Sequence, residues 1–247
     1  MKKVLILVLA LSLVAVGAVY ATIVGSKHDM RQVTGIAAGT TQVCVYCHHP
    51  HRGVDSSGTI TTGTLLWNMK PGYTTFSSYN TYASASMNAT TSKFSDFASA
   101  SGNQLYSLYC LACHDGNTSG NALVRAPKDG TAGTLSAIGT QILDHQADIV
   151  NASGNDLTND HPVNFNYTTD NDAGIKAFTV GTGGSDVVIG NITATTYPLY
   201  GGTMQCATCH DVHNGTKSAK DNGIQFMRGT TAIITGSTIC RDCHTNK

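Results

Sequence analysis

Four copies of one five-residue pattern, Cys-x-x-Cys-His, contain every cysteine of this 247-residue chain and constrain its fold more than any other feature. The cysteines are Cys44, Cys47, Cys110, Cys113, Cys206, Cys209, Cys240 and Cys243, and the histidines that follow each pair are His48, His114, His210 and His244. The pattern is the attachment motif for c-type haem, in which two thiols bond to the porphyrin vinyl groups and the histidine binds the iron. The sequence therefore predicts four covalently bound haem c groups.

Other uses of paired cysteines fit the pattern less well. Zinc ribbons use Cys-x-x-Cys units, and exported proteins use disulfides, but neither requires a histidine after every second cysteine. Thioredoxin-like redox sites contain one such unit rather than four. Because all eight cysteines belong to the four motifs, we expect neither a disulfide nor a free thiol.

The composition indicates that side chains alone supply little of the core. Only 12% of the residues are charged, and Gly, Ser, Thr and Asn, which favour turns over helix interiors, are abundant. Four haems in about 226 residues after a leader would provide the missing apolar surface. The predicted fold class is a multihaem cytochrome c, mostly coil with short helices and a few short strands wrapped around four haems. We expect the motifs on short helices and strands near 162–167, 186–189 and 195–200.

The first residues are typical of a signal peptide. Lys2 and Lys3 precede an apolar run from 4 to 16, and small residues follow near Ala21. A membrane anchor is the alternative, but it needs about 20 apolar residues. We therefore predict a signal peptide at 1–21 and a single tetrahaem domain at 22–247, secreted and without a membrane span in the mature chain.

The charge balance argues against nucleic acid as a partner. Without Lys2 and Lys3, 13 Lys and Arg face 15 acidic residues, all of them Asp. The sequence contains no basic tract or stripe.

Six further histidines are candidates for the second axial ligand: His28, His49, His51, His145, His161 and His213. His51 and His213 each lie three residues after a motif histidine, too close to reach the opposite face of the same porphyrin. We therefore predict that His51 and His213 each bind the iron of a neighbouring haem. His28 and His161 each have an adjacent Asp that can orient the ring.

Other ligands stay open at this point. His49 lies beside Pro50, where reaching another iron looks strained, and His145 is a reserve. Methionine ligation through Met30, Met204 or Met227 is a further alternative and would raise the reduction potential.

Several ordered motifs together resemble one group of cytochromes. They are Ser-Lys-His-Asp at 26–29, Cys-x-x-Cys-His-x-Pro-His at 44–51, Cys-His-Asp-Gly at 113–116, Asn-Asp-His-Pro-Val at 159–163 and Cys-His-Asp-x-His at 209–213. The chain resembles the extracellular tetrahaem c-type cytochrome nanowires, the OmcE-like multihaem cytochromes. The resemblance implies a mostly coil fold, bis-histidine haems with His28, His51, His161 and His213 as distal ligands, and polymerisation into a filament. His49 departs from the group, which more often has a small polar residue there.

The predicted function is electron transfer along four closely packed bis-histidine haems, in an extracellular conductive filament that exports electrons. Its partners would be copies of itself arranged head to tail, and redox proteins or an extracellular acceptor. A soluble periplasmic tetrahaem shuttle is the alternative. A reductase is disfavoured because an enzyme needs an open iron, so we expect an electron carrier rather than an enzyme. In a filament, His51 is the candidate to close the last haem of the neighbouring subunit, unless it binds a haem of its own chain.

The four motifs predict about four haems per chain. The haem-to-protein ratio follows from pyridine haemochrome absorbance and protein concentration. A ratio below about three and a half would contradict the prediction from the motif count.

Overall fold

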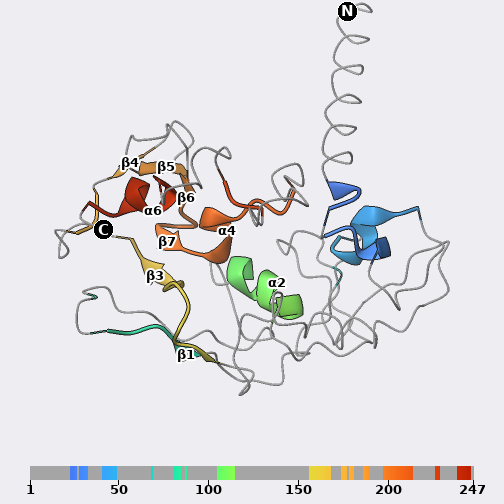
Figure 1. Cartoon of the computed structure of the whole chain (residues 1–247), viewed down its shortest axis with the longest axis horizontal. Helices are drawn as coiled ribbons and strands as arrows, with labels where there is room; N and C mark the ends of the chain where they lie inside the picture. The colour runs from blue at the N-terminus through green and yellow to red at the C-terminus, as the bar shows by residue number, and fades with distance from the viewer. Residues whose placement is uncertain are drawn as a thin grey trace, which may run out of the picture.

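The computed structural model describes the chain at residues 23–26, 28–32, 41–48, 68, 80–84, 87, 105–114, 156–167, 174–176, 178–180, 186–189, 197–213, 226–228 and 238–245. The predicted signal peptide, His49, His51 and His145 lie outside these residues. Figure 1 shows the N-terminal segments at one side of the molecule, α2 in the middle and α6 at the other side. Among the described residues, no helix has the length and apolar character needed to cross a membrane.

The described helices are short, and each motif lies on one of them. They are η1 Met30–Gln32, η2 Val43–Tyr46, α2 Leu105–His114, α4 Cys206–Cys209 and α6 Thr238–Cys243. Residues three apart lie on the same face of a helix, so a Cys-x-x-Cys turn directs both cysteines to one side. This local geometry is what two bonds to one porphyrin require.

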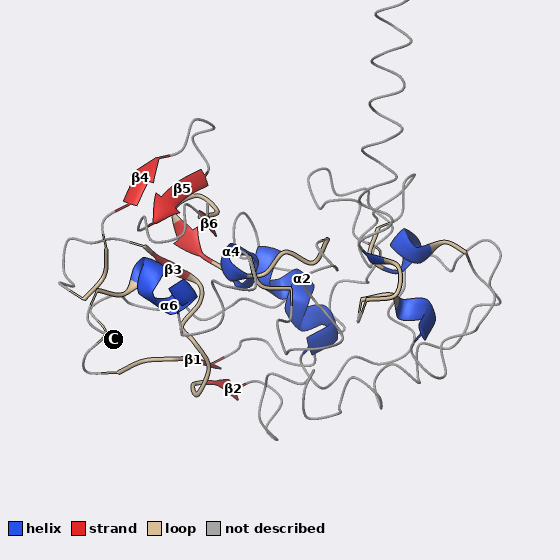
Figure 2. Ribbon diagram, turned by 45° about the horizontal axis from the view of Figure 1, so that its top comes forward, coloured by secondary structure: helices blue, strands red, loops and turns tan. Residues whose placement is uncertain are grey.

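The described strands are also short, and two of the described sheets pair segments that lie far apart in sequence (Figure 2). β1 Asn80–Thr81 pairs with β2 Asp156–Leu157 in parallel, and β3 Phe165–Asn166 pairs with β7 Thr203–Met204 in antiparallel. A three-stranded antiparallel sheet has the order β4 Phe178–Val180, β5 Asp186–Ile189 and β6 Tyr197–Pro198. The chain therefore holds distant segments together with small ladders rather than one large sheet.

Of the three predicted strands, the one at 186–189 has the predicted length. The segment at 162–167 contains just β3, because Asn164 takes a left-handed conformation with φ 60° and interrupts the extended backbone. In the segment at 195–200, the described strand is β6. Its Pro198 has no N–H to continue a ladder.

A small apolar core lies around the C-terminal motifs. Tyr167, Tyr197, Leu199 and Met204 are buried together, and Phe165, Ile175, Ile239 and Cys243 pack against them. Met204 is only 3% exposed in this cluster, so its side chain is occupied in packing. The wrapping of the whole chain around haems stays a prediction.

A buried polar contact ties this core to the last motif. The Tyr197 hydroxyl donates to a carboxylate oxygen of Asp242 over 2.9 Å, and both side chains are buried. Asp242 lies between Cys240 and Cys243. A buried carboxylate that loses a donor costs more than the same bond at the surface.

Replacing Tyr197 with Phe is expected to lower the free energy of unfolding by about 1–3 kcal/mol, because the variant removes a donor to buried Asp242. Denaturant unfolding of the haem-loaded protein measures the change. Tyr106→Phe is the matched control, since Tyr106 stacks on Tyr200 through its ring, which the variant retains. The control should lower the free energy of unfolding by no more than about 0.5 kcal/mol. Equal losses in both variants would contradict the proposed importance of the Tyr197–Asp242 bond.

Candidate metal centres

Three motif histidines each face a histidine from a distant part of the chain. The ring centroids are 6.0 Å apart for His28 and His114 and 6.0 Å apart for His48 and His213. The third pair, His161 and His244, has a centroid distance of 6.3 Å. In each pair, one histidine follows a Cys-x-x-Cys turn and the other is a predicted distal ligand.

These distances fit an iron between the two rings. An imidazole nitrogen lies about 2.0–2.1 Å from a bound first-row metal and about 1.1 Å from its own ring centroid. Two imidazoles on opposite sides of one iron therefore have centroids about 6.2–6.4 Å apart. The observed spacings of 6.0–6.3 Å come close to this range, and the facing residues have the donor type that a bis-histidine haem requires.

The ring planes differ between the pairs. His48 and His213 are nearly parallel, with an interplanar angle of 24°. The other two pairs are close to perpendicular, at 69° for His28 with His114 and 67° for His161 with His244.

His28 lies in a tightly packed environment. Its ring stacks on Phe226 at a centroid distance of 4.2 Å and an interplanar angle of 16°. The pKa of His28 is lowered to about 4, mainly by burial and then by the neighbouring His114, His210 and His213, while a hydrogen bond with the Val212 backbone opposes the shift. The ring is therefore neutral at neutral pH, which is the form that binds a metal.

The loop that carries His28 is held by a buried ion pair. Asp29 is 1% exposed, and Arg31 donates to both of its carboxylate oxygens over 2.7 and 2.6 Å. The Gly25 N–H also donates to Asp29. The hydrogen bond from Arg31 is the main reason why the pKa of Asp29 is lowered.

His161 has the hydrogen bond typical of a metal-binding histidine. Its Nδ1 lies 2.9 Å from the carbonyl oxygen of Pro162. A carbonyl only accepts, so Nδ1 carries the proton and Nε2 is left as the free donor atom for a metal. Residues 159–163 were singled out by sequence, and this bond gives the histidine within them a fixed tautomer.

His213 and His48 bring the first and third motifs together. His213 lies three residues after His210, yet its ring faces His48 of the first motif. Burial lowers the pKa of His213, and the charge of His48 lowers it further. One short segment from His210 to His213 therefore touches two candidate haem sites.

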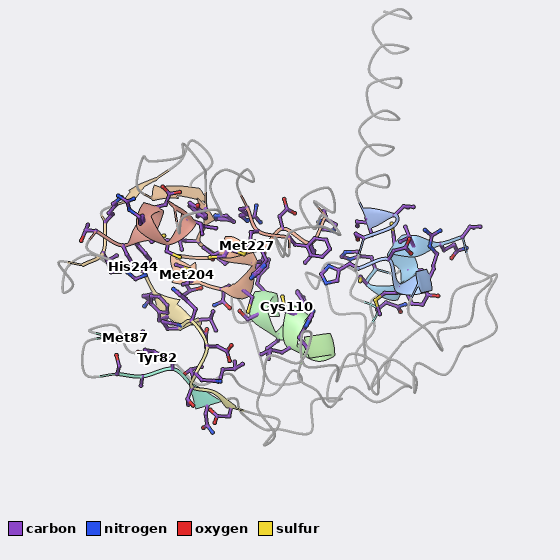
Figure 3. The ribbon with its side chains drawn as sticks, viewed as in Figure 1. Tyr82, Met87, Cys110, Met204, Met227 and His244 are labelled. Carbon is purple, nitrogen blue, oxygen red and sulfur yellow. The ribbon has the colours of Figure 1, made fainter. Side chains whose placement is uncertain are left out.

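The cysteines of successive motifs are also close. A hydrogen bond between the thiols of Cys110 and Cys206 is the main cause that lowers the pKa of Cys206. Figure 3 shows Cys110 on α2, which contacts α4. Burial raises the pKa of Cys209 to about 11 and that of Cys243 to about 12. A cysteine of the other motif also raises each pKa: Cys240 for Cys209, and Cys209 for Cys243.

A buried network joins the second and third motifs. The Ser107 hydroxyl donates to Gln205 over 2.6 Å and accepts the N–H of Cys206 over 3.0 Å. The Gln205 amide donates to Asn164 and to Thr203. This network fixes α2 against α4 and sets the approach of the Cys110 and Cys206 thiols.

The remaining predicted ligands have different outcomes. Three pairs include six of the eight predicted iron ligands, and the other two are His210, which is described, and His51, which is not. Met30 lies in η1 and Met227 pairs with His210 in a backbone bridge. Within the described part of the chain, no three histidines, cysteines or acidic residues gather into a metal cluster. A haem iron takes only two ligands from the protein.

Sequence reasoning did not single out Asn68, Lys176 or Arg228, which contact the motifs directly. Their backbone N–H groups donate to Cys47, Cys243 and Cys209. The three residues differ in type and in distance from their motifs along the chain, so no sequence signal marks them.

Family models, curated proteins and solved structures were compared with the chain, and none of them matches it.

Replacing His161 with Ala is expected to open the iron bound by His244 and to produce one high-spin haem in the oxidised protein. Electron paramagnetic resonance (EPR) and absorbance spectra measure the change, and the haem count should stay at four because both cysteines of every motif are retained. Added imidazole should restore the low-spin spectrum by filling the opened position. An all-low-spin variant without imidazole would show that His161 is not an iron ligand.

Proposed function

We propose that the chain is a tetrahaem c-type cytochrome that transfers electrons along a series of closed, bis-histidine haems. The observation that carries this proposal is the set of three histidine pairs, each joining a motif histidine to a distant one at 6.0–6.3 Å. Two independent features coincide in each pair. The motif supplies covalent attachment, and the facing ring supplies the sixth ligand.

The haem supplies the one-electron chemistry when it is bound. In each of the three pairs, the chain's own two histidines would hold the iron and would leave no position for a substrate molecule. The carbonyl of Pro162 orients His161, and the Val212 backbone and Phe226 orient His28. A ligand set held in this way suits electron transfer better than small-molecule reduction.

Contacts between motifs support a continuous path through the chain. The Cys110 and Cys206 thiols bring the second and third attachment points together. Cys209 and Cys243 do the same for the third and fourth points. The first point joins the third because His213 faces His48.

The fourth iron is assigned to His210 with His51 as its distal ligand. His244 faces His161 of the same chain. This pairing favours His210 over the last motif as the partner of His51, which revises the hypothesis drawn from motif order. The histidine comes from the same chain in a monomeric shuttle and from the same or the neighbouring chain in a filament.

Secretion and polymerisation into a conducting filament complete the proposal, and they rest on the resemblance to the nanowire cytochromes. Electron microscopy of the secreted fraction separates the filament from the shuttle. Filaments that show a periodic subunit support polymerisation, and a monomer in the periplasm supports the shuttle.

The purified protein is expected to take up about four electrons per chain, one at each motif, with every iron low-spin before and after reduction. Spectroelectrochemical titration counts the electrons, and EPR checks the spin state. Cyanide and carbon monoxide serve as probes of an open iron. Ready binding of either ligand by the unmodified protein would overturn the electron-carrier proposal in favour of a reductase.

A further inference from the structure

Among the described residues, the same set of hydrogen bonds recurs at the first, third and fourth motifs, although the residues that make it differ. In each, the motif histidine donates its N–H to the carbonyl of the first cysteine. The distances are 2.8 Å for His48 to Cys44, 3.1 Å for His210 to Cys206 and 2.9 Å for His244 to Cys240. This bond closes one helical turn. The carbonyls of the residue after the first cysteine and of the second cysteine then have no hydrogen-bond donor within the turn.

One residue from elsewhere in the chain then donates twice to those carbonyls. Its backbone N–H donates to the second cysteine: Asn68 to Cys47 over 2.9 Å, Arg228 to Cys209 over 2.7 Å and Lys176 to Cys243 over 2.8 Å. Its side-chain nitrogen donates to the residue after the first cysteine: Asn68 to Val45 over 2.5 Å, Arg228 to Ala207 over 3.0 Å and Lys176 to Arg241 over 2.5 Å.

The third and fourth motifs share a further feature. The residue before the donor pairs with the motif histidine in an antiparallel bridge, Met227 with His210 and Ile175 with His244. The residue after each histidine also donates back. The Asp211 N–H reaches Phe226 over 2.7 Å, and the Thr245 N–H reaches Gly174 over 2.9 Å. The backbone of each histidine is thus held on both sides.

We propose that Asn68, Lys176 and Arg228 are positioning residues, each of which clamps one haem-attachment motif so that its histidine keeps a fixed orientation toward the iron. This inference rests on the proposed function. The shared property is a side-chain N–H donor rather than a charge, since Asn68 is neutral and fully buried, at 0% exposed. Such donors are needed because a porphyrin bonded to both thiols limits the access of water to the motif's carbonyls.

The clamps also connect separate candidate sites. The segment that provides Arg228 contains Phe226, whose ring stacks on His28 of another histidine pair. Phe226 holds φ 56°, a strained value for an aromatic residue, and is 5% exposed. Residues 226–228 therefore contact two candidate sites. They position His210 of the third motif and also His28, which faces His114 of the second motif.

The test compares haem-loaded Arg228→Met and Arg228→Lys with the unmodified protein. Arg228→Met removes the hydrogen bond to Ala207 and also the ion pair in which Arg228 Nη1 lies 3.8 Å from Asp211 Oδ2. Loss of the hydrogen bond alone, worth roughly 0.5–1.5 kcal/mol, should speed hydrogen exchange of the peptide over 206–211 by about two- to thirteenfold. The EPR signal of the third haem should broaden because its histidine takes several orientations. Arg228→Lys should restore both properties, because lysine fills the equivalent place in the fourth motif.

Lys176→Met and Lys176→Arg repeat the test at the fourth motif, where the change should appear in the peptide over 240–245. Arg241→Met is the matched control, because Arg241 is an exposed basic residue of that motif whose carbonyl, not its side chain, makes the clamp contact. It should leave exchange and EPR unchanged. Asn68→Asp, which replaces the buried donor with an acceptor, should have the largest effect.

Two results would overturn the clamp proposal: exchange and EPR of Arg228→Met and Lys176→Met equal to the unmodified protein, or lysine and arginine failing to replace each other. Failure of the proposed function looks different. In that case the unmodified protein itself lacks four haems or contains open irons, whatever the clamp variants do.

Discussion

The spacing between facing imidazoles is the constraint on which the other features of this chain depend. Two histidine rings held about 6 Å apart leave room for a metal ion between them, and each pair joins a motif histidine to a predicted distal ligand. The pairs join segments far apart in sequence, such as His48 with His213. The buried apolar residues lie mainly in the motif helices η2 and α2 and in a cluster near the C-terminal motifs. Metal–histidine bonds between these segments would add to the cohesion that this packing supplies.

Backbone hydrogen bonding explains how such short helices keep their motif histidines in place. A four-residue helix such as α4 leaves most of its carbonyls without an internal partner. Outside donors supply the missing bonds, and the same donors fix the position of the histidine that ends the turn. The polar network around Gln205 acts on a larger scale, because it sets one motif helix against another. Buried polar groups thus serve both local stability and the arrangement of the candidate metal centres.

Much of the candidate site could be predicted from sequence, since Cys-x-x-Cys-His carries its chemistry within five residues. His28, His161 and His213 were also singled out, and each lies opposite a motif histidine. Their pairing could not be predicted. His213 follows the third motif but faces the first, and no local rule relates residues so far apart. The strand at 162–167 is shorter than predicted because Asn164 takes a left-handed conformation that interrupts the extended backbone.

The sequence by itself determined the number of Cys-x-x-Cys-His motifs, the attachment chemistry that they predict and the supply of histidines, because thiol spacing and ligand type are local properties. Only the tertiary structure decided which histidines face each other, which thiols touch, and which residues clamp the motifs. Asn68, Lys176 and Arg228 show the reason most clearly. A hydrogen-bond donor can be an amide, an ammonium or a guanidinium, and it can come from either side of the motif in the chain. Its role is set by where the fold places its nitrogen, not by its identity.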